Sequence, residues 1–155
     1  MQADCPYEAT DPVCLLRNEH SLLLGKLRLL EQGEKDPGAV KGLMRTIIRD
    51  SEVHFKREAL LLRALAEKLE SGGRSFHHLT DEHEDLERQA HYLLQNLETY
   101  SKRGARTGAV GCLIREYATL FREHIHHEET VVYILVRTRL TIQQQQHLAR
   151  EILSV

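Results

Sequence analysis

The chain has 155 residues, of which 28% are charged and 41% are apolar, and its formal net charge is −2. A chain of this length is most simply one domain, and it is long enough to bury a core. The small net charge provides no basic field, which argues against nucleic acid and anionic membrane surfaces as partners. No apolar run approaches the ~20 residues that are needed to span a bilayer.

The three cysteines, Cys5, Cys14 and Cys112, include no Cys-x-x-Cys pair. Their number and spacing argue against a disulfide scaffold and for a reducing compartment. Cys5 and Cys14 are near enough in sequence to pair under oxidation, but three ordinary thiols are the simpler interpretation. Residues Met1 to Thr10 lack the apolar core of a secretion signal. We therefore expect a cytoplasmic protein.

Turn signals divide the sequence into four long helical segments and a short tail. Asp11 and Pro12 provide a cap and a first-turn proline for the first helix. Capping-box spacing marks the start of the third helix at Asp81–Glu84 and of the last at Thr141–Gln144. The expected helices span about residues 12–32, 39–70, 81–102 and 109–137, followed by a short last helix to about 153, with breaks at 33–38, 71–73 and 104–108.

Each long helix carries one stripe of residues spaced three or four apart, which is the pattern of a buried face. In every stripe a histidine or glutamate interrupts an otherwise apolar series, and Glu87 lies one step beside the third stripe. The four stripes are Val13, Leu16, His20, Leu23, Leu27, Leu30; Val40, Met44, Ile47, Ser51, His54, Glu58, Leu61, Leu65; Leu79, His83, Leu86, Ala90, Leu93, Leu97; and Val110, Ile114, Tyr117, Phe121, His124, Glu128, Val131, Leu135.

The polar residues of these stripes have the types and spacing of metal ligands. Residues four apart lie one above the other on a helix, so each His-x-x-x-Glu pair can present an imidazole and a carboxylate to one point. A buried carboxylate without a partner costs several kcal/mol, and a shared cation removes that cost. The candidate ligands are His20 alone on the first helix, and the pairs His54 and Glu58, His83 and Glu87, and His124 and Glu128 on the next three.

Counting residues from each turn places these candidates at one level of an all-α, up-down-up-down four-helix bundle with a short C-terminal helix. His20 and His54 lie about 13 and 16 residues from the turn between their helices, which is ~20–24 Å at ~1.5 Å per residue. Glu87 and His124 are similarly matched about the third turn. The connection at 71–80 must climb back by ~15 Å, which ten extended residues can span. Side chains of facing helices in such a bundle can hold a two-metal site.

The sequence resembles the hemerythrin-like, or HHE cation-binding, domains from about Val13 to Leu153. Four short motifs, in this order and spacing, carry the resemblance: Asn18-Glu19-His20, His54-Phe-Lys-Arg-Glu58, Asp81-Glu82-His83-Glu84 and Phe121-Arg-Glu-His124-Ile-His-His-Glu128-Glu129. We expect residues 1–11 to be an N-terminal segment and 12–155 to form the hemerythrin-like domain.

The resemblance implies a non-haem centre of two iron ions joined by an oxo or hydroxo bridge. It also implies that Glu58 and Glu128 bridge the two ions and that the histidines are terminal ligands. Oxygen-carrying members have His-x-x-x-His on the third helix, where this chain has Glu87. The site is therefore richer in carboxylates and closer to that of the nitric-oxide-responsive and iron-sulfur-repair relatives. Glu87 can ligate, accept a hydrogen bond from a ligand histidine or face solvent.

Two classes of function fit this site. In the first, the protein binds or reacts with dioxygen, peroxide or nitric oxide, and whether it does so as an enzyme is left open. In the second, it is an iron or redox sensor or an iron-handling module without catalysis, including iron-sulfur repair. Zinc or manganese in place of iron is compatible with the same ligands. Tyr117, two turns from His124, could donate a hydrogen bond at the site, although core packing is the simpler role.

Overall fold

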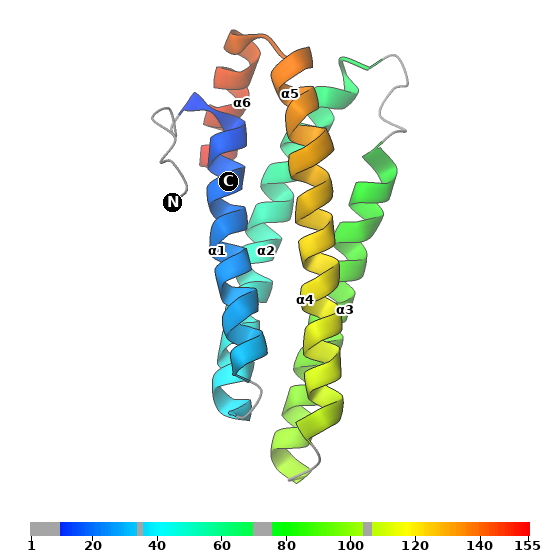
Figure 1. Ribbon diagram of the computed structural model, residues 1–155. Coiled ribbons are helices and arrows are strands. Elements are labelled where there is room, and N and C mark those ends of the chain that lie inside the picture. The colour runs from blue at the N-terminus through cyan, green and yellow to red at the C-terminus, as the bar shows by residue number, and fades with distance from the viewer. Residues whose placement is uncertain (1–9, 34–35, 70–75, 104–106) are drawn as a thin grey trace.

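The computed structural model describes residues 10–33, 36–69, 76–103 and 107–155, and within these ranges the regular structure is helical, with no strand. Asp11 caps the first helix by accepting hydrogen bonds from the backbone N–H groups of Val13 and Cys14. The helices are α1 (Pro12–Gln32), α2 (Pro37–Ala66), α3 (His77–Arg103), α4 (Thr107–His127), the π-helix η3 (Glu128–Val132), α5 (Tyr133–Arg139) and α6 (Ile142–Ser154) (Figure 1).

Four helices form the predicted up-down-up-down bundle. Each of α1 and α3 packs against both α2 and α4, so that neighbours along the chain are also neighbours in space (Figure 1). The π-helix and α5 continue the line of α4, and α6 then folds back against α1 and α2. The predicted capping box at the start of this last helix is confirmed, because Thr141 and Gln144 exchange both of its hydrogen bonds.

Two of the predicted helix boundaries are wrong. The second helix ends at Ala66 rather than near residue 70, because Lys68 and Leu69 donate to carbonyls three residues back and so tighten the chain into a turn. The third helix begins at His77, so the predicted capping box at Asp81–Glu84 lies inside the helix. The predicted break at 71–73 lies outside the described residues, as do parts of the breaks at 33–38 and 104–108.

The buried face of the fourth helical segment follows the predicted stripe as far as Glu128 and then shifts by one residue. The prediction that Val131 is buried is wrong: 44% of its surface is exposed, whereas Val132 is 1% exposed. The π-helix causes the shift, because its wider turn takes one residue more than an α-turn before it returns to the same face. Tyr133 and Val136 are consequently buried in place of Leu135.

The core consists of two apolar clusters with a layer of polar side chains between them. The larger cluster includes Leu23, Met44 and Phe121, and the smaller one includes Leu16, Leu61 and Tyr133 at the end covered by α6. On α1, His20 lies between Leu16 of one cluster and Leu23 of the other, and it is fully buried. The polar layer is therefore enclosed above and below by apolar side chains.

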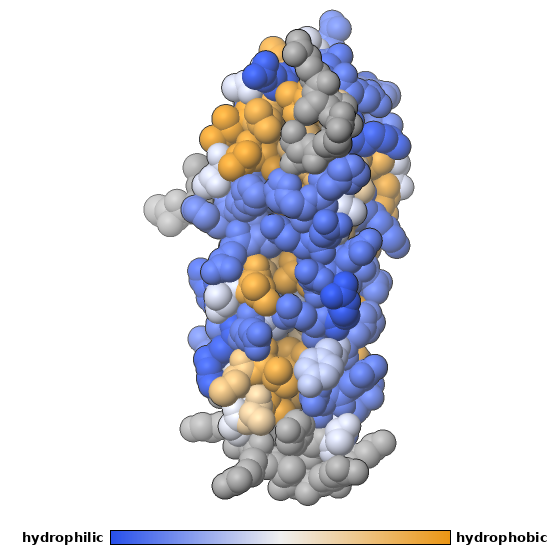
Figure 2. All heavy atoms as spheres, turned by 90° about the vertical axis from the view of Figure 1, so that its right-hand side faces the viewer, coloured by the Kyte–Doolittle hydropathy of each residue, from blue (hydrophilic) through white to orange (hydrophobic). Residues whose placement is uncertain are grey.

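The surface is mainly hydrophilic on the face that α3 presents, and apolar residues appear there in separate areas (Figure 2). None of the described helices has an apolar stretch of the length that a membrane span requires. The expectation of three ordinary thiols is wrong for Cys14, which is disulfide-bonded, whereas Cys112 is free and exposed. The alternative pairing of Cys14 with Cys5 involves a residue outside the described ranges. With Cys14 in a disulfide, the cysteines no longer argue for a reducing compartment.

Candidate metal centre

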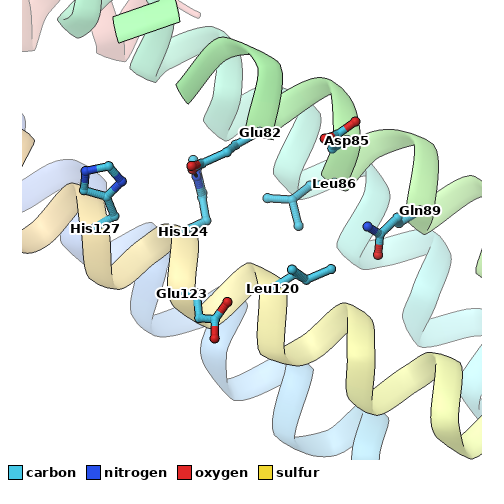
Figure 3. A pocket seen from close by; sticks show the side chains of 8 residues that line it. All are labelled: Glu82, Asp85, Leu86, Gln89, Leu120, Glu123, His124 and His127. Atoms are coloured by element: carbon cyan, nitrogen blue, oxygen red, sulfur yellow. Dashed lines mark hydrogen bonds and ion pairs between the residues drawn. The ribbon is translucent and has the colours of Figure 1, made fainter. Parts of the chain in front are cut away.

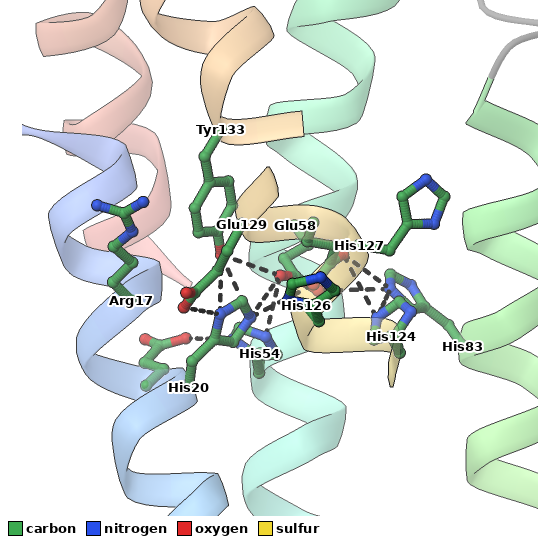
Figure 4. A network of polar contacts seen from close by, with 12 residues as sticks. Arg17, His20, His54, Glu58, His83, His124, His126, His127, Glu129 and Tyr133 are labelled. Atoms are coloured by element: carbon green, nitrogen blue, oxygen red, sulfur yellow. Dashed lines mark hydrogen bonds and ion pairs between the residues drawn. The ribbon is translucent and has the colours of Figure 1, made fainter. Parts of the chain in front are cut away.

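Six polar side chains from the four helices of the bundle meet in the layer between the two apolar clusters (Figure 4). The most exposed of them, His83, is only 8% exposed. Charged and polar groups are rarely buried to this extent without specific partners. This central cluster consists of His20 of α1, His54 and Glu58 of α2, His83 of α3, His124 of α4 and Glu128 at the first position of the π-helix.

The central cluster divides into two groups of four ligand atoms, and within each group all atoms lie within 4.8 Å of one another. Both groups include Glu58 and Glu128. The first group adds His20 and His54, and the second group adds His83 and His124.

The two shared carboxylates each direct one oxygen to each group. Oε1 of Glu58 is 3.2 Å from His20 Nε2, and its Oε2 is 3.4 Å from His83 Nε2. Oε2 of Glu128 is 3.3 Å from His20 Nε2, and its Oε1 is 3.4 Å from His124 Nε2. A carboxylate with its oxygens divided in this way has the geometry needed to bridge two cations.

Three further carboxylates bind the outward nitrogens of the histidines. Nδ1 of His54 donates to Glu19 at 2.8 Å, and Nδ1 of His124 donates to Glu82 at 2.8 Å. Nδ1 of His20 donates to Glu129 at 3.0 Å. A carboxylate can only accept here, so each of these bonds places a ring proton on Nδ1 and turns Nε2 towards the central cluster.

Three inward-facing atoms of the central cluster are acceptors without a hydrogen-bond donor. His54 Nε2, Glu58 Oε2 and Glu128 Oε2 are buried and form no hydrogen bond. Nε2 of His83 and Nε2 of His124 lie 3.0 Å apart, and His83 is the donor in this hydrogen bond because the proton of His124 is on its other nitrogen. Buried acceptors facing one another are unfavourable unless a proton or a metal cation lies between them.

The shifted pKa values of the central cluster also indicate that its carboxylates favour positive charge on their neighbours. Burial opposes a charge on His20, but the carboxylates of Glu128, Glu129 and Glu58 outweigh it and raise the pKa of this histidine to about 11. The pKa of His83 rises to about 9 for the same reason. Burial would raise the pKa of Glu58, but the surrounding histidines hold it well below its ordinary value. Without metal, the central cluster therefore retains protons that metal cations would replace.

Glu87, the seventh residue that the sequence predicted as a ligand, contributes no atom to either group. Its side chain is half-buried. Tyr117, which the sequence placed near the site as a possible hydrogen-bond donor, is buried in the larger apolar cluster and packs against Phe121 with ring centroids 5.9 Å apart. Core packing is thus the contact observed for Tyr117.

Sequence reasoning missed the carboxylates of Glu19, Glu82 and Glu129 and the side chain of Tyr133. The acidic residues had a local signal, because each is adjacent in sequence to a residue of the central cluster. The signal was incomplete, because Glu19 and Glu82 bind the histidine of the next helix rather than their own neighbour. Which histidine Glu19 and Glu82 bind is determined only by the packing of the helices against one another.

A pocket between α3 and α4 reaches the central cluster from one side (Figure 3). Its volume is about 300 Å³. His124 and its partner Glu82 form part of its wall. The pocket therefore lies on the side of the second group. Its remaining lining residues are Asp85, Leu86, Gln89, Leu120, Glu123 and His127.

A four-helix bundle with four buried histidines and two shared carboxylates defines a helical protein whose core is suited to a metal centre. The Hemerythrin HHE cation binding domain family matches residues 11–136, and the chain belongs to this family. A comparison with curated proteins found no match, and a comparison with solved structures found none either. The match includes the whole central cluster and ends within α5.

Proposed function

We propose that this protein holds two iron ions in the central cluster and binds or reacts there with dioxygen, peroxide or nitric oxide. The observation that carries the proposal is the placement of the carboxylate oxygens of Glu58 and Glu128. Each of these side chains directs one oxygen to the first group and the other oxygen to the second group. Two sets of mixed imidazole and carboxylate donors fit iron, which accepts both kinds of ligand. The ligands would be the six residues of the central cluster, without Glu87.

The protein would contribute orientation, charge and exclusion of water. Glu19, Glu82 and Glu129 hold three of the imidazoles with their lone pairs directed inward. The two apolar clusters shield the layer from solvent, and the pocket beside His124 provides access for a small molecule. Bound iron would supply the capacity to exchange electrons with the oxidant.

A second function, iron or redox sensing without catalysis, is favoured by the distribution of the ligands over the helices. They come from all four helices of the bundle, so binding and loss of metal must act on the packing of the whole bundle. Sensing and reaction with an oxidant use the same site and differ in whether the oxidant is consumed repeatedly.

Anaerobic loading with ferrous iron tests the proposed function. We expect two iron ions per chain by elemental analysis and a change in the visible spectrum when dioxygen, peroxide or nitric oxide is added. Repeated consumption of the oxidant would support reaction, and a single change that persists would support sensing. Fewer than two ions per chain, or a spectrum that none of the three alters, would contradict the proposal.

Substitution of Glu19 tests the role of the outer carboxylates. We expect Glu19→Gln to weaken binding of one of the two ions by roughly 10- to 100-fold, because the histidine it orients loses a charged acceptor. Glu52→Gln, an exposed glutamate on the same helix as that histidine, is the matched control. Competition with a coloured chelator measures both affinities. Equal affinities in the two variants would show that Glu19 does not position a ligand.

A further inference from the structure

Tyr133 is buried directly beside the first group of the central cluster (Figure 4). Its phenol oxygen lies 3.3 Å from His20 Nε2 and 3.4 Å from Glu58 Oε1. The tyrosine ring stacks on the His20 ring, with centroids 5.5 Å apart and an interplanar angle of 12°. The oxygen lies 3.5 Å from His20 Nδ1, so it sits beside the histidine ring and slightly closer to its inward nitrogen.

These distances match those between the atoms of the first group. His20 Nε2 and His54 Nε2 lie 3.2 and 3.0 Å from Glu58 Oε1, and His20 Nε2 lies 3.3 Å from Glu128 Oε2. Metal bonds of roughly 2.0–2.2 Å place neighbouring ligand atoms of one ion about 3 Å apart. The oxygen of Tyr133 therefore lies about as far from His20 Nε2 and Glu58 Oε1 as the atoms of the first group lie from one another.

The π-helix is what brings this tyrosine to the site. The backbone N–H of Tyr133 donates to the carbonyl of Glu128, five residues earlier. In an α-helix a residue five positions later points roughly 140° away around the axis. The wider π-turn instead brings Tyr133 and Glu128 to the same face, and such turns occur frequently at functional sites.

Among the residues that the structure describes, the ring that stacks on a histidine of the second group is a phenylalanine rather than a tyrosine. There the ring of Phe55 stacks on His83, with centroids 4.2 Å apart and an interplanar angle of 12°. A phenyl ring offers no ligand atom. The two groups therefore differ in the aromatic residue that stacks on one of their histidines.

We propose that Tyr133 is a further metal ligand, whose phenolate oxygen binds the ion held by His20 and His54. This inference rests on the proposed two-iron site. Coordination replaces the O–H bond of the phenol by an oxygen–metal bond and releases the proton to water. The ion of the first group then has five protein ligands, and the ion of the second group keeps four beside the pocket.

The test uses the colour of the ferric protein, because a phenolate bound to ferric iron gives a charge-transfer band in the visible. We expect this band in the wild-type protein and its loss in Tyr133→Phe. Tyr117→Phe is the matched control, since Tyr117 is also buried but packs in the larger apolar cluster. We expect it to keep the band, and all three proteins to hold two iron ions.

Resonance Raman spectroscopy of the wild-type protein gives a result that needs no variant to fold. Excitation within the band should enhance the ring vibrations of a coordinated tyrosine. Two bound iron ions without these vibrations, or with a band that Tyr133→Phe retains, would overturn the assignment of Tyr133 and leave the two-iron site intact. A wild-type protein without iron would overturn the proposed function and this ligand together.

Discussion

Replacement of Glu58 by glutamine is expected to abolish the binding of two metal ions per chain. The two oxygens of Glu58 lie within 3.4 Å of inward nitrogens of different groups, so the substitution alters both ion positions at once. It also removes a buried negative charge that would balance the charge of the cations. Elemental analysis of the loaded protein should show fewer than two ions, and circular dichroism should show that the helices remain.

Glu87→Gln is the matched control for this experiment, because Glu87 is a glutamate of the same bundle that contributes no atom to either group. We expect this variant to bind two ions as the wild-type protein does. Retention of both ions by Glu58→Gln would mean that the assignment of ligands is wrong. Loss of one ion from Glu87→Gln would restore Glu87 as a ligand.

The central cluster was predictable from sequence because it depends on helix periodicity. His54 and Glu58 lie four residues apart within a stripe whose members are all buried. A regular α-helix fixes which residues share a face, so such a stripe gives the direction of each side chain without knowledge of the partners. The short connections then require antiparallel neighbours, which brings the four stripes together.

The position of Tyr133 was not predictable in the same way, because a single π-turn changes the register of every residue after it. Periodicity placed Val131 on the buried face, and the structure places Val132 there. The sequence Glu128-Glu129-Thr130-Val131-Val132 contains neither glycine nor proline that would indicate an irregular turn.

The metal-free protein is expected to lose stability as the pH rises from about 6.5 to 9. The pKa of His83 is raised from 6.5 to about 9 and that of His20 to about 11. A histidine whose pKa is raised on folding contributes stability that is complete below pH 6.5 and is lost as the pH rises through the folded value. Several kcal/mol are involved, which corresponds to a fall in Tm of roughly 10 °C or more.

Thermal unfolding with a chelator, followed by circular dichroism between pH 6 and 9, measures this fall. His147→Ala changes an exposed histidine on α6 and should leave the slope unchanged. Glu58→Gln should reduce the slope, because the carboxylate that faces both His20 and His83 loses its charge. A Tm that is constant or rises over this range in the wild-type protein would show that the histidines do not hold protons.

The metal-loaded protein should respond to pH in the opposite sense. Protons compete with metal for the histidines, so metal affinity increases as the pH rises and the protons leave. The gap in Tm between loaded and metal-free protein should therefore widen from pH 6.5 to 9. Because the ligands join four helices, the loss of metal at the upper end of this range would loosen the bundle most. Such a response is what an iron-sensing role requires, and a gap that is small at every pH would contradict that role.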